Sequence, residues 1–207
     1  GSTQDKYSVA VIATGGLLDT LAAIRAGLMP IWGCDIDPIA QSMWKDLAGS
    51  NCYRDVLTLS AESLRRPRVL KIGLPCLDYT GLGSQAGARG KTDHLYVKQA
   101  EMILRISPDA VIIEQSGNAP NINCGAEVRE LISKLKEQYY VHVVDRTKHK
   151  MGDQFGVPVW HYGDVSTRVQ FIIVGFHHRI GETAKAFQFP QPHFDELKYP
   201  IAADIAV

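Results

Sequence analysis

The chain has 207 residues and balances 22 Lys and Arg against 22 Asp and Glu, so its formal net charge is zero. This length favours one compact α/β domain, and the balanced charge argues against a protein that holds nucleic acid by a basic surface of its own alone. Hydrophobic residues make up 45% of the chain, yet no apolar run approaches the roughly 18 residues of a membrane span, so the sequence predicts a soluble protein with no membrane partner.

Two kinds of apolar segment alternate along the chain. Short β-branched runs predict buried strands, and longer runs with apolar residues at helical spacing predict helices. In chain order, the predicted elements are a strand at 7–13, a helix at 17–26, a strand at 29–34, a helix at 38–48, a strand near 69–72, a helix near 93–106, a strand at 110–113, a helix near 126–138, and strands at 141–144 and 169–175. This alternation predicts a mostly parallel sheet with helices on both faces. The last two strands are joined by a loop, which predicts an antiparallel hairpin at one edge.

The four cysteines are scattered, without a CxxC motif or a mixed Cys and His spacing. This pattern indicates neither a zinc site nor a disulfide framework, so we expect no bound metal. Reduced thiols in turn predict a nuclear or cytoplasmic location.

Polar or reactive residues follow the strands at the points where they end. In a parallel sheet such residues meet beyond one edge, where ligands bind. They are Gly15 and Gly16, Asp35 and Asp37, Asp55, Pro75 and Cys76, and Glu114. Aspartates in these places also cap helices, which is the better interpretation for Asp37. The recurrence at five strand ends nevertheless predicts a site.

The first of these strand ends indicates an adenosine ligand. A glycine turn followed about 20 positions later by an acidic residue places backbone near the ligand and a carboxylate on its ribose. Neither GxGxxG nor a Walker lysine is present. These residues therefore favour S-adenosylmethionine, with a nicotinamide dinucleotide and an oxidoreductase as the alternative.

Several segments taken together resemble the C5-cytosine DNA methyltransferase family. They are GLPCLDYTG at 73–81, VIIEQS at 111–116, GVP at 156–158 followed by STRV at 166–169, and FQFPQP at 187–192. The resemblance runs from Val9 to about Pro192 and implies a Rossmann-like S-adenosylmethionine-dependent methyltransferase fold. Residues 1–6 are expected to be a tag remnant and N-terminal tail, 7–192 the catalytic core, and 193–207 a segment leading toward a recognition domain.

The resemblance implies a covalent mechanism. Cys76 would add its thiolate to carbon 6 of cytosine, Glu114 would hydrogen-bond ring N3, and Arg168 would bind the base oxygen. The target base would be flipped out of its stack. The loop that closes over it would include Thr80, Gly81, Gly83 and Gly87.

The resemblance also implies a cofactor pocket for S-adenosylmethionine and its product S-adenosylhomocysteine. Gly15 and Gly16 would lie near the methionine part, Asp35 on the ribose, Ile36 against the adenine face and Asp55 at the adenine amino group, with Val56, Pro75 and Leu95 also lining the pocket.

The chain departs from the family pattern in several places. Ala13–Leu18 replaces Phe-x-Gly-x-Gly-Gly, Gln115 and Ser116 replace Asn-Val, and Ser166 stands where a first arginine is common. Family members also continue past such a chain into a target-recognition domain, so the expected partners are DNA and a complementary subunit or domain. The alternatives are the same chemistry on RNA, such as tRNA, and a catalytically weak interaction module.

Overall fold

The structure is a computed structural model that describes residues 7–73, 93–121, 125–144, 150–151, 154–155, 157–158 and 169–191. The strands are β1 (Ser8–Ile12), β2 (Met29–Cys34), β3 (Asn51–Tyr53), β4 (Val69–Gly73), β5 (Ala110–Ser116), β6 (Tyr139–Val143), β7 (Lys150–Met151), β8 (Gln154–Phe155), β9 (Val157–Pro158) and β10 (Val169–His177). The α-helices are α2 (Leu18–Arg25), α3 (Pro38–Ala48), α4 (Asp93–Ile106) and α5 (Ala126–Leu135). Short 3-10 turns follow β3 as η1 (Val56–Thr58) and η2 (Ala61–Ser63), and β10 as η6 (His178–Ile180) and η7 (Glu182–Ala186).

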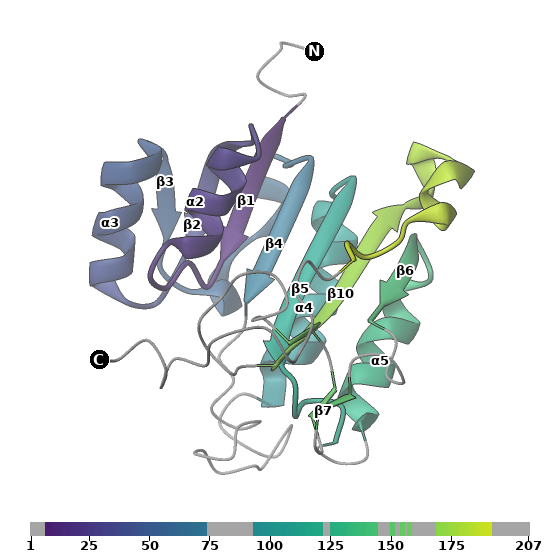
Figure 1. The fold of residues 1–207 in the computed structure, drawn as a ribbon. Coiled ribbons are helices and arrows are strands. Elements are labelled where there is room, and N and C mark those ends of the chain that lie inside the picture. The colour runs from purple at the N-terminus through teal and green to yellow at the C-terminus, as the bar shows by residue number, and fades with distance from the viewer. Residues whose placement is uncertain are drawn as a thin grey trace.

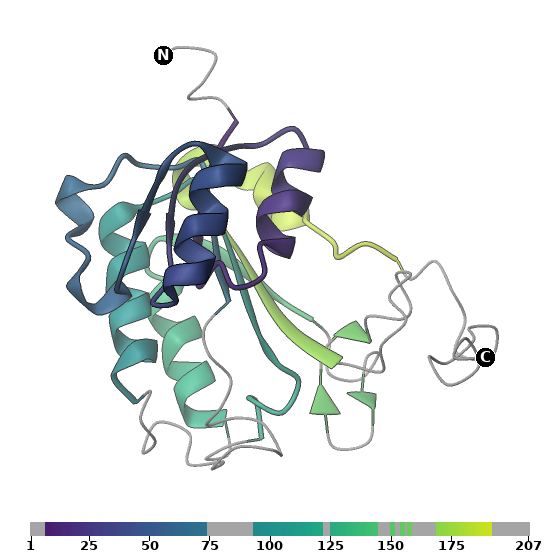
Figure 2. The same ribbon diagram turned by 90° about the vertical axis from the view of Figure 1, so that its left-hand side faces the viewer.

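The main sheet has the strand order β3-β2-β1-β4-β5-β10-β6, and β9 pairs with β10. The first five strands run parallel, while β10 is antiparallel to both β5 and β6 (Figure 1). Helices α2 and α3 cover one face, and α4 and α5 cover the other (Figure 2). The prediction of a mostly parallel sheet with helices on both faces and an antiparallel edge is confirmed.

The structure also refines the predicted element limits. β3 was not predicted, because three residues are too few to show a periodicity. Its parallel pairing with β2 defines it as a strand. Helix α5 ends at Leu135 instead of 138, and β6 begins at Tyr139 instead of 141. Tyr139 is fully buried, and its hydroxyl donates to the carbonyl of Pro108 at 3.0 Å, which holds the start of this strand in the core.

The α2–α3 face depends on a close approach at Gly33 of β2. A Cβ atom there would lie 2.6 Å from the ring of Trp44, a fully buried side chain of α3. Glycine therefore lets the indole pack directly on the strand. This packing fixes α3 against the strand that ends at Cys34.

Asp37 caps α3, as its sequence context predicts. Its side chain accepts a hydrogen bond from the Ile39 N–H at 2.9 Å, and Pro38 occupies the first turn. This geometry satisfies one of the unpaired N–H groups at the helix start. It gives Asp37 a structural role.

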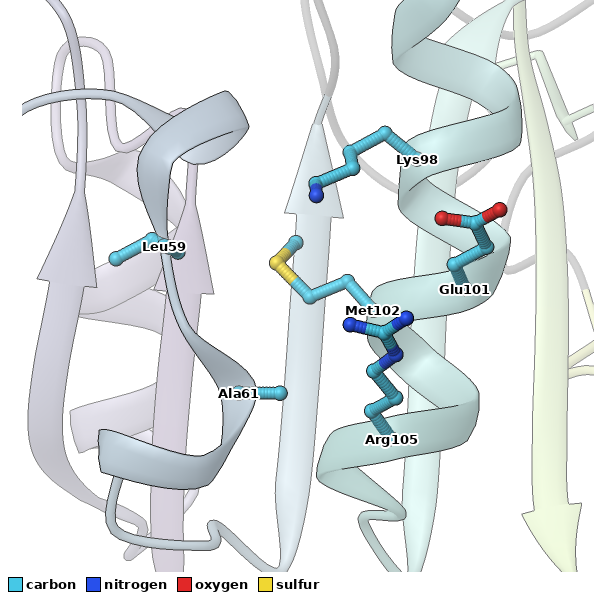
Figure 3. Close-up of a pocket in the computed structure, with 6 residues that line it drawn as sticks. All are labelled: Leu59, Ala61, Lys98, Glu101, Met102 and Arg105. Carbon is cyan, nitrogen blue, oxygen red and sulfur yellow. The ribbon is translucent and has the colours of Figure 1, made fainter.

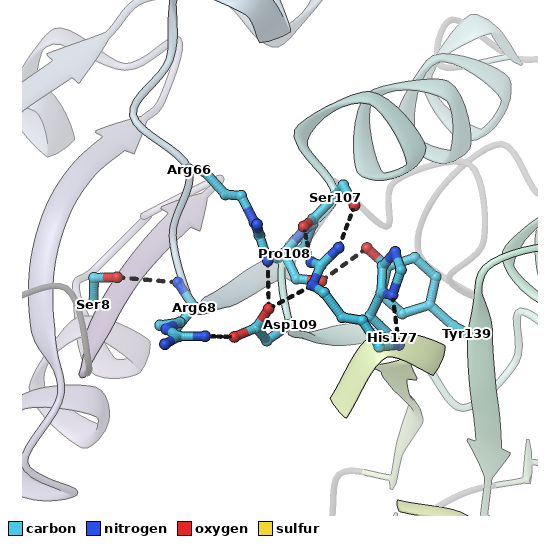
Figure 4. A network of polar contacts seen from close by, with 9 residues as sticks. Ser8, Arg66, Arg68, Ser107, Pro108, Asp109, Tyr139 and His177 are labelled. Carbon is cyan, nitrogen blue, oxygen red and sulfur yellow. Dashed lines mark hydrogen bonds and ion pairs between the residues drawn. The ribbon is translucent and has the colours of Figure 1, made fainter. Parts of the chain in front are cut away.

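The amino-terminal ends of β4 and β5 are joined by an ion cluster around Asp109 (Figure 4). Arg179 Nε donates to this carboxylate at 2.8 Å, and Arg66 and Arg68 pair with it as well. Burial works to raise the pKa of Asp109, but the hydrogen bonds and charges of the arginines outweigh it, so the pKa lies below its usual range. The cluster connects η6, which follows β10, to the segment before β4 at the edge away from the predicted site.

Candidate active site at the carboxyl edge of the sheet

The strands β1 to β5 end together at one edge of the sheet, the lower edge in Figure 1. The register pairs Ile12 with Cys34 and with Ile72, and Gly73 with Glu114. The residues predicted to follow these strands therefore lie along the same edge of the sheet. Those in the described part of the chain are Gly15, Gly16, Asp35, Ile36, Asp55, Val56 and Glu114.

The turn after β1 is unusual because two non-glycine residues adopt a left-handed backbone. Ala13 has a φ of 59° and Leu17 a φ of 62°, and Gly15 lies between them at 47°. The left-handed region costs an L-residue about 1–2 kcal/mol. The side chain of Leu17 is buried against Val9 and Val11, which offsets that cost. Hydrophobic packing therefore helps to hold the turn in this shape.

Asp35 joins this turn to the end of β2. Its Oδ2 accepts hydrogen bonds from the Gly15 N–H at 2.7 Å and the Thr14 hydroxyl at 3.2 Å, and its Oδ1 accepts the Asp37 N–H at 2.9 Å. A carboxylate offers about four acceptor positions. Asp35 therefore keeps room for one more donor, such as a sugar hydroxyl. Ile36 follows it with 80% of its surface exposed.

Asp55 lies at the end of the neighbouring strand β3. The Asp35 N–H donates to the Tyr53 carbonyl at 3.0 Å, so the two strand ends are held together. Asp55 also caps η1 by accepting the Leu57 N–H at 2.9 Å on Oδ1. Val56 is half-buried and packs against the main core. The capping interpretation of Asp55 is correct, and it leaves the second carboxylate oxygen for a ligand.

The two cysteines behind these aspartates are poor nucleophiles. Burial, followed by the charges of Cys52, Asp35 and Asp55, raises the pKa of Cys34 to about 12. Burial and the charge of Asp35 also raise the pKa of Cys52. Both side chains are therefore protonated thiols near neutral pH, and only a thiolate attacks efficiently.

Glu114 lies beside two charged residues that the sequence did not single out. Lys71 Nζ is 2.6 Å from Asp19 Oδ2 and 4.0 Å from Glu114 Oε2. Lys71 belongs to β4, Glu114 to β5 and Asp19 to the first turn of α2. A lysine inside an otherwise apolar strand was the available signal, but its partners depend on the packing of three elements.

The remaining predicted residues lie outside the described part of the chain, and their roles stay predictions. They are Pro75, Cys76, Thr80, Gly81, Gly83, Gly87 and Arg168, while Leu95 lies in α4 with its side chain outside that part.

A pocket lies between α4 and the η1–η2 segment, on the face of the sheet that α4 covers (Figure 3). Its lining residues are Leu59, Ala61, Lys98, Glu101, Met102 and Arg105. None of them belongs to the predicted site, so this pocket carries no part of the chemistry developed below.

Sequence comparison identifies relatives among DNA methyltransferases. The family described as C-5 cytosine-specific DNA methylase matches residues 14–205. The type II methyltransferase M.HpaII of Haemophilus parainfluenzae is 27% identical over 167 residues, which cover 78% of this chain and 43% of that protein. M1.ScrFI of Lactococcus lactis subsp. cremoris is 23% identical over 163 residues, covering 78% of this chain and 39% of that protein. The chain thus spans about two fifths of the length of these relatives.

Solved structures share the fold. A proposed DNA modification methyltransferase encoded within an E. coli prophage superposes with a TM-score of 0.65 at 18% identity, covering 84% of this chain and 47% of that one. The Spodoptera frugiperda DNMT2 mutant gives 0.59 at 17% identity, covering 92% and 54%. The likeness supports the arrangement of strands and helices described above.

Proposed function

The chain belongs to the C-5 cytosine-specific DNA methylase family, and from this premise we propose that it forms the catalytic core of an enzyme that methylates carbon 5 of cytosine in DNA. The observation that carries the proposal is the arrangement at the carboxyl edge. The glycine turn, Asp35, Asp55 and Glu114 lie along this edge. The strand β4, which ends at Gly73, leads directly into Pro75 and Cys76.

The hydrogen-bond acceptors and the apolar surface at this edge fit S-adenosylmethionine. Asp35 retains acceptor capacity beside the glycine turn, and the exposed Ile36 offers an apolar surface for a purine ring. Asp55 has one oxygen that its cap does not use, which suits an exocyclic amine. When bound, this cosubstrate supplies an electrophilic methyl group, and the residues of the chain orient it.

Cys76 is the proposed nucleophile. Its thiolate adds to carbon 6 of cytosine, and the electron pair of the 5,6 double bond forms a bond from carbon 5 to the methyl carbon, while the methyl–sulfur bond breaks and S-adenosylhomocysteine leaves. Loss of the proton from carbon 5 then returns the electrons to the ring and expels the thiolate. The described alternatives, Cys34 and Cys52, are held as thiols by their raised pKa values.

Glu114 and Arg168 are proposed to assist this addition. A carboxyl group hydrogen-bonded to ring N3 withdraws charge as the thiolate adds, and a guanidinium on the base oxygen stabilises the adduct. Glu114 lies in β5, two residues before the strand ends at Ser116, and is opposite Gly73 in the register. The same strand ends therefore supply the proposed acid and lead to the nucleophile.

Target recognition is proposed to come from a complementary domain or subunit. The chain has no net charge and spans only 43% of M.HpaII. Neutralising DNA phosphates ordinarily needs a basic surface. A partner segment that carries such a surface would position the flipped cytosine over the strand ends.

Transfer of labelled methyl groups tests the proposal. The chain, alone and supplied with a recognition segment of a related methyltransferase, is incubated with labelled S-adenosylmethionine and either duplex DNA or tRNA. We expect label in DNA and a loss of at least about a thousandfold with Cys76→Ala, because the covalent route disappears. Cys52→Ala, which removes a half-buried thiol, is the matched control and should retain activity. Full activity of Cys76→Ala would refute the mechanism, and label in tRNA alone would refute the DNA substrate.

A further inference from the structure

Lys71 is a charged residue in the interior of the sheet. It occupies the middle of β4, and its side chain is only 12% exposed. A buried ammonium is costly unless it is paired. On its own face of the sheet it lies 2.6 Å from Asp19 and 4.0 Å from Glu114, whereas the neighbouring residues Leu70 and Ile72 point into the apolar core on the other face.

Gly73 leaves the space in which these three charged groups meet. A Cβ atom there would lie 3.3 Å from both Glu114 Oε2 and Lys71 Nζ, and 3.8 Å from Asp19 Oδ2. Lys71 and Gly73 are two residues apart on one strand and therefore share a face. The register then places Glu114 directly beside Gly73. The cluster of Asp19, Lys71 and Glu114 is thus built by β4, β5 and α2 together.

A purely structural interpretation covers only part of this arrangement. The contact between Lys71 and Asp19 is enough to fasten α2 to the sheet. The approach of the same ammonium to Glu114 adds an interaction with the proposed acid of the reaction. Lys71 and Asp19 both bring charge close to Glu114, and β10 places the apolar Ile172 opposite it.

We propose that Lys71 is a positioning residue for the reaction, an inference that rests on the proposed function: its ammonium holds the Glu114 carboxyl in place and sets that carboxyl's charge, while Asp19 moderates the effect. An ammonium near a carboxylate favours its ionised form, and a second carboxylate favours the neutral form. Asp19 lies in the first turn of α2, directly after the glycine turn. The cluster therefore connects the cofactor turn to the proposed acid.

The test uses variants of the full chain that remove either the positive or the negative charge near Glu114. Lys71→Met keeps the length of the side chain and removes the charge, Asp19→Asn leaves Lys71 with Glu114 as its remaining carboxylate in the cluster, and Lys71→Arg restores the charge. The titration of Glu114 is followed by ¹³C NMR with labelled glutamate, and Glu114→Gln identifies its resonance. The pH dependence of methyl transfer is measured on the same variants.

We expect Lys71→Met to move the midpoint of the Glu114 titration to higher pH by at least about half a unit, as a unit charge near 4 Å implies. Asp19→Asn should move it to lower pH, and Lys71→Arg should leave it near the parent. The limb of the rate profile that Glu114 controls should shift in the same directions. A loss of structure alone would not produce opposite shifts, and circular dichroism checks that each variant is folded.

The two readouts separate this inference from the proposed function. Opposite NMR shifts in a chain that transfers no methyl groups even when a recognition segment is supplied support the cluster and contradict the enzymatic proposal. Methyl transfer with unchanged midpoints in both Lys71→Met and Asp19→Asn overturns the role of Lys71 and leaves the proposed function standing.

Discussion

The carboxylate of Asp35 accepts a hydrogen bond from the backbone N–H of Gly15 at 2.7 Å and thereby fixes the turn after β1 to the end of β2. The two residues are 20 positions apart in the sequence, and their contact defines one side of the proposed cofactor site. A backbone turn that contains left-handed Ala13 and Leu17 needs such support.

Replacing Asp35 with asparagine should therefore reduce stability as well as cofactor binding. An amide has one acceptor oxygen and no charge, so it cannot accept all three of the hydrogen bonds that Asp35 accepts. We expect a loss of about 1–2 kcal/mol in the free energy of unfolding in urea, with weaker binding of S-adenosylhomocysteine in calorimetry. Asp37→Asn is the matched control, because asparagine caps helices about as well as aspartate. Equal losses for both variants would contradict this assignment.

Gly33→Ala should destabilise the chain by about 1–3 kcal/mol, because the added Cβ atom would meet the Trp44 ring at 2.6 Å in a core without room to move. Gly16→Ala is the control, since a Cβ atom there meets nothing within 4 Å. Thermal unfolding of both variants measures the difference. A Gly33→Ala variant as stable as the parent would show that the indole packs elsewhere.

Alkylation by iodoacetamide should distinguish the cysteines. The pKa of Cys34 is raised to about 12 by burial and nearby negative groups, so its thiolate fraction at pH 8 is on the order of one in ten thousand. We expect Cys34 to react at least about a thousandfold more slowly than a free thiol, as followed by mass spectrometry of its peptide in the native protein. Labelling of Cys34 at the rate seen in denatured protein would disprove this expectation.

The alternation of strands and helices was predictable because the spacing of apolar residues within each segment indicates which element it forms. The turn at Gly15 and Gly16, the cap at Asp37 and the gathering of strand ends at one edge follow from the same pattern. Strand β3 was not predictable, because Asn51–Tyr53 has too few residues to show a period and depends on β2 for its pairing.

The charge clusters could not be predicted for a different reason. Lys71 meets Asp19 and Glu114 only once the register of β4 and β5 and the position of α2 are known. Similarly, Asp109 meets Arg179 across 70 positions in the sequence. Such contacts depend on tertiary structure, which local sequence patterns do not reveal. The left-handed backbone of Leu17 could not be predicted either, because leucine disfavours this conformation and only packing in the core stabilises it.

The Asp109 cluster predicts how stability depends on pH. The pKa of Asp109 is below its usual range because hydrogen bonds and charges of the arginines outweigh burial. A carboxyl with a depressed pKa stabilises the folded state fully above its unfolded pKa of about 3.9, and this contribution is lost as the pH falls through the folded value. We therefore expect Asp109→Asn to lower the free energy of unfolding by about 2–3 kcal/mol at pH 7. Breaking a fully buried ion pair would cost more, but Arg66 and Arg68 are about half exposed.

The difference between the parent and Asp109→Asn should shrink as the pH falls below about 4, because the parent then loses the charge that the variant never had. Urea unfolding from pH 7 down to pH 3 measures it. Glu182→Gln is the control: this carboxyl pairs with Lys185 on an exposed turn, where ion pairs contribute little. A constant difference across this range would mean that the Asp109 side chain stabilises the fold by its shape and neutral hydrogen bonds, and that its charge and the arginines around it are dispensable.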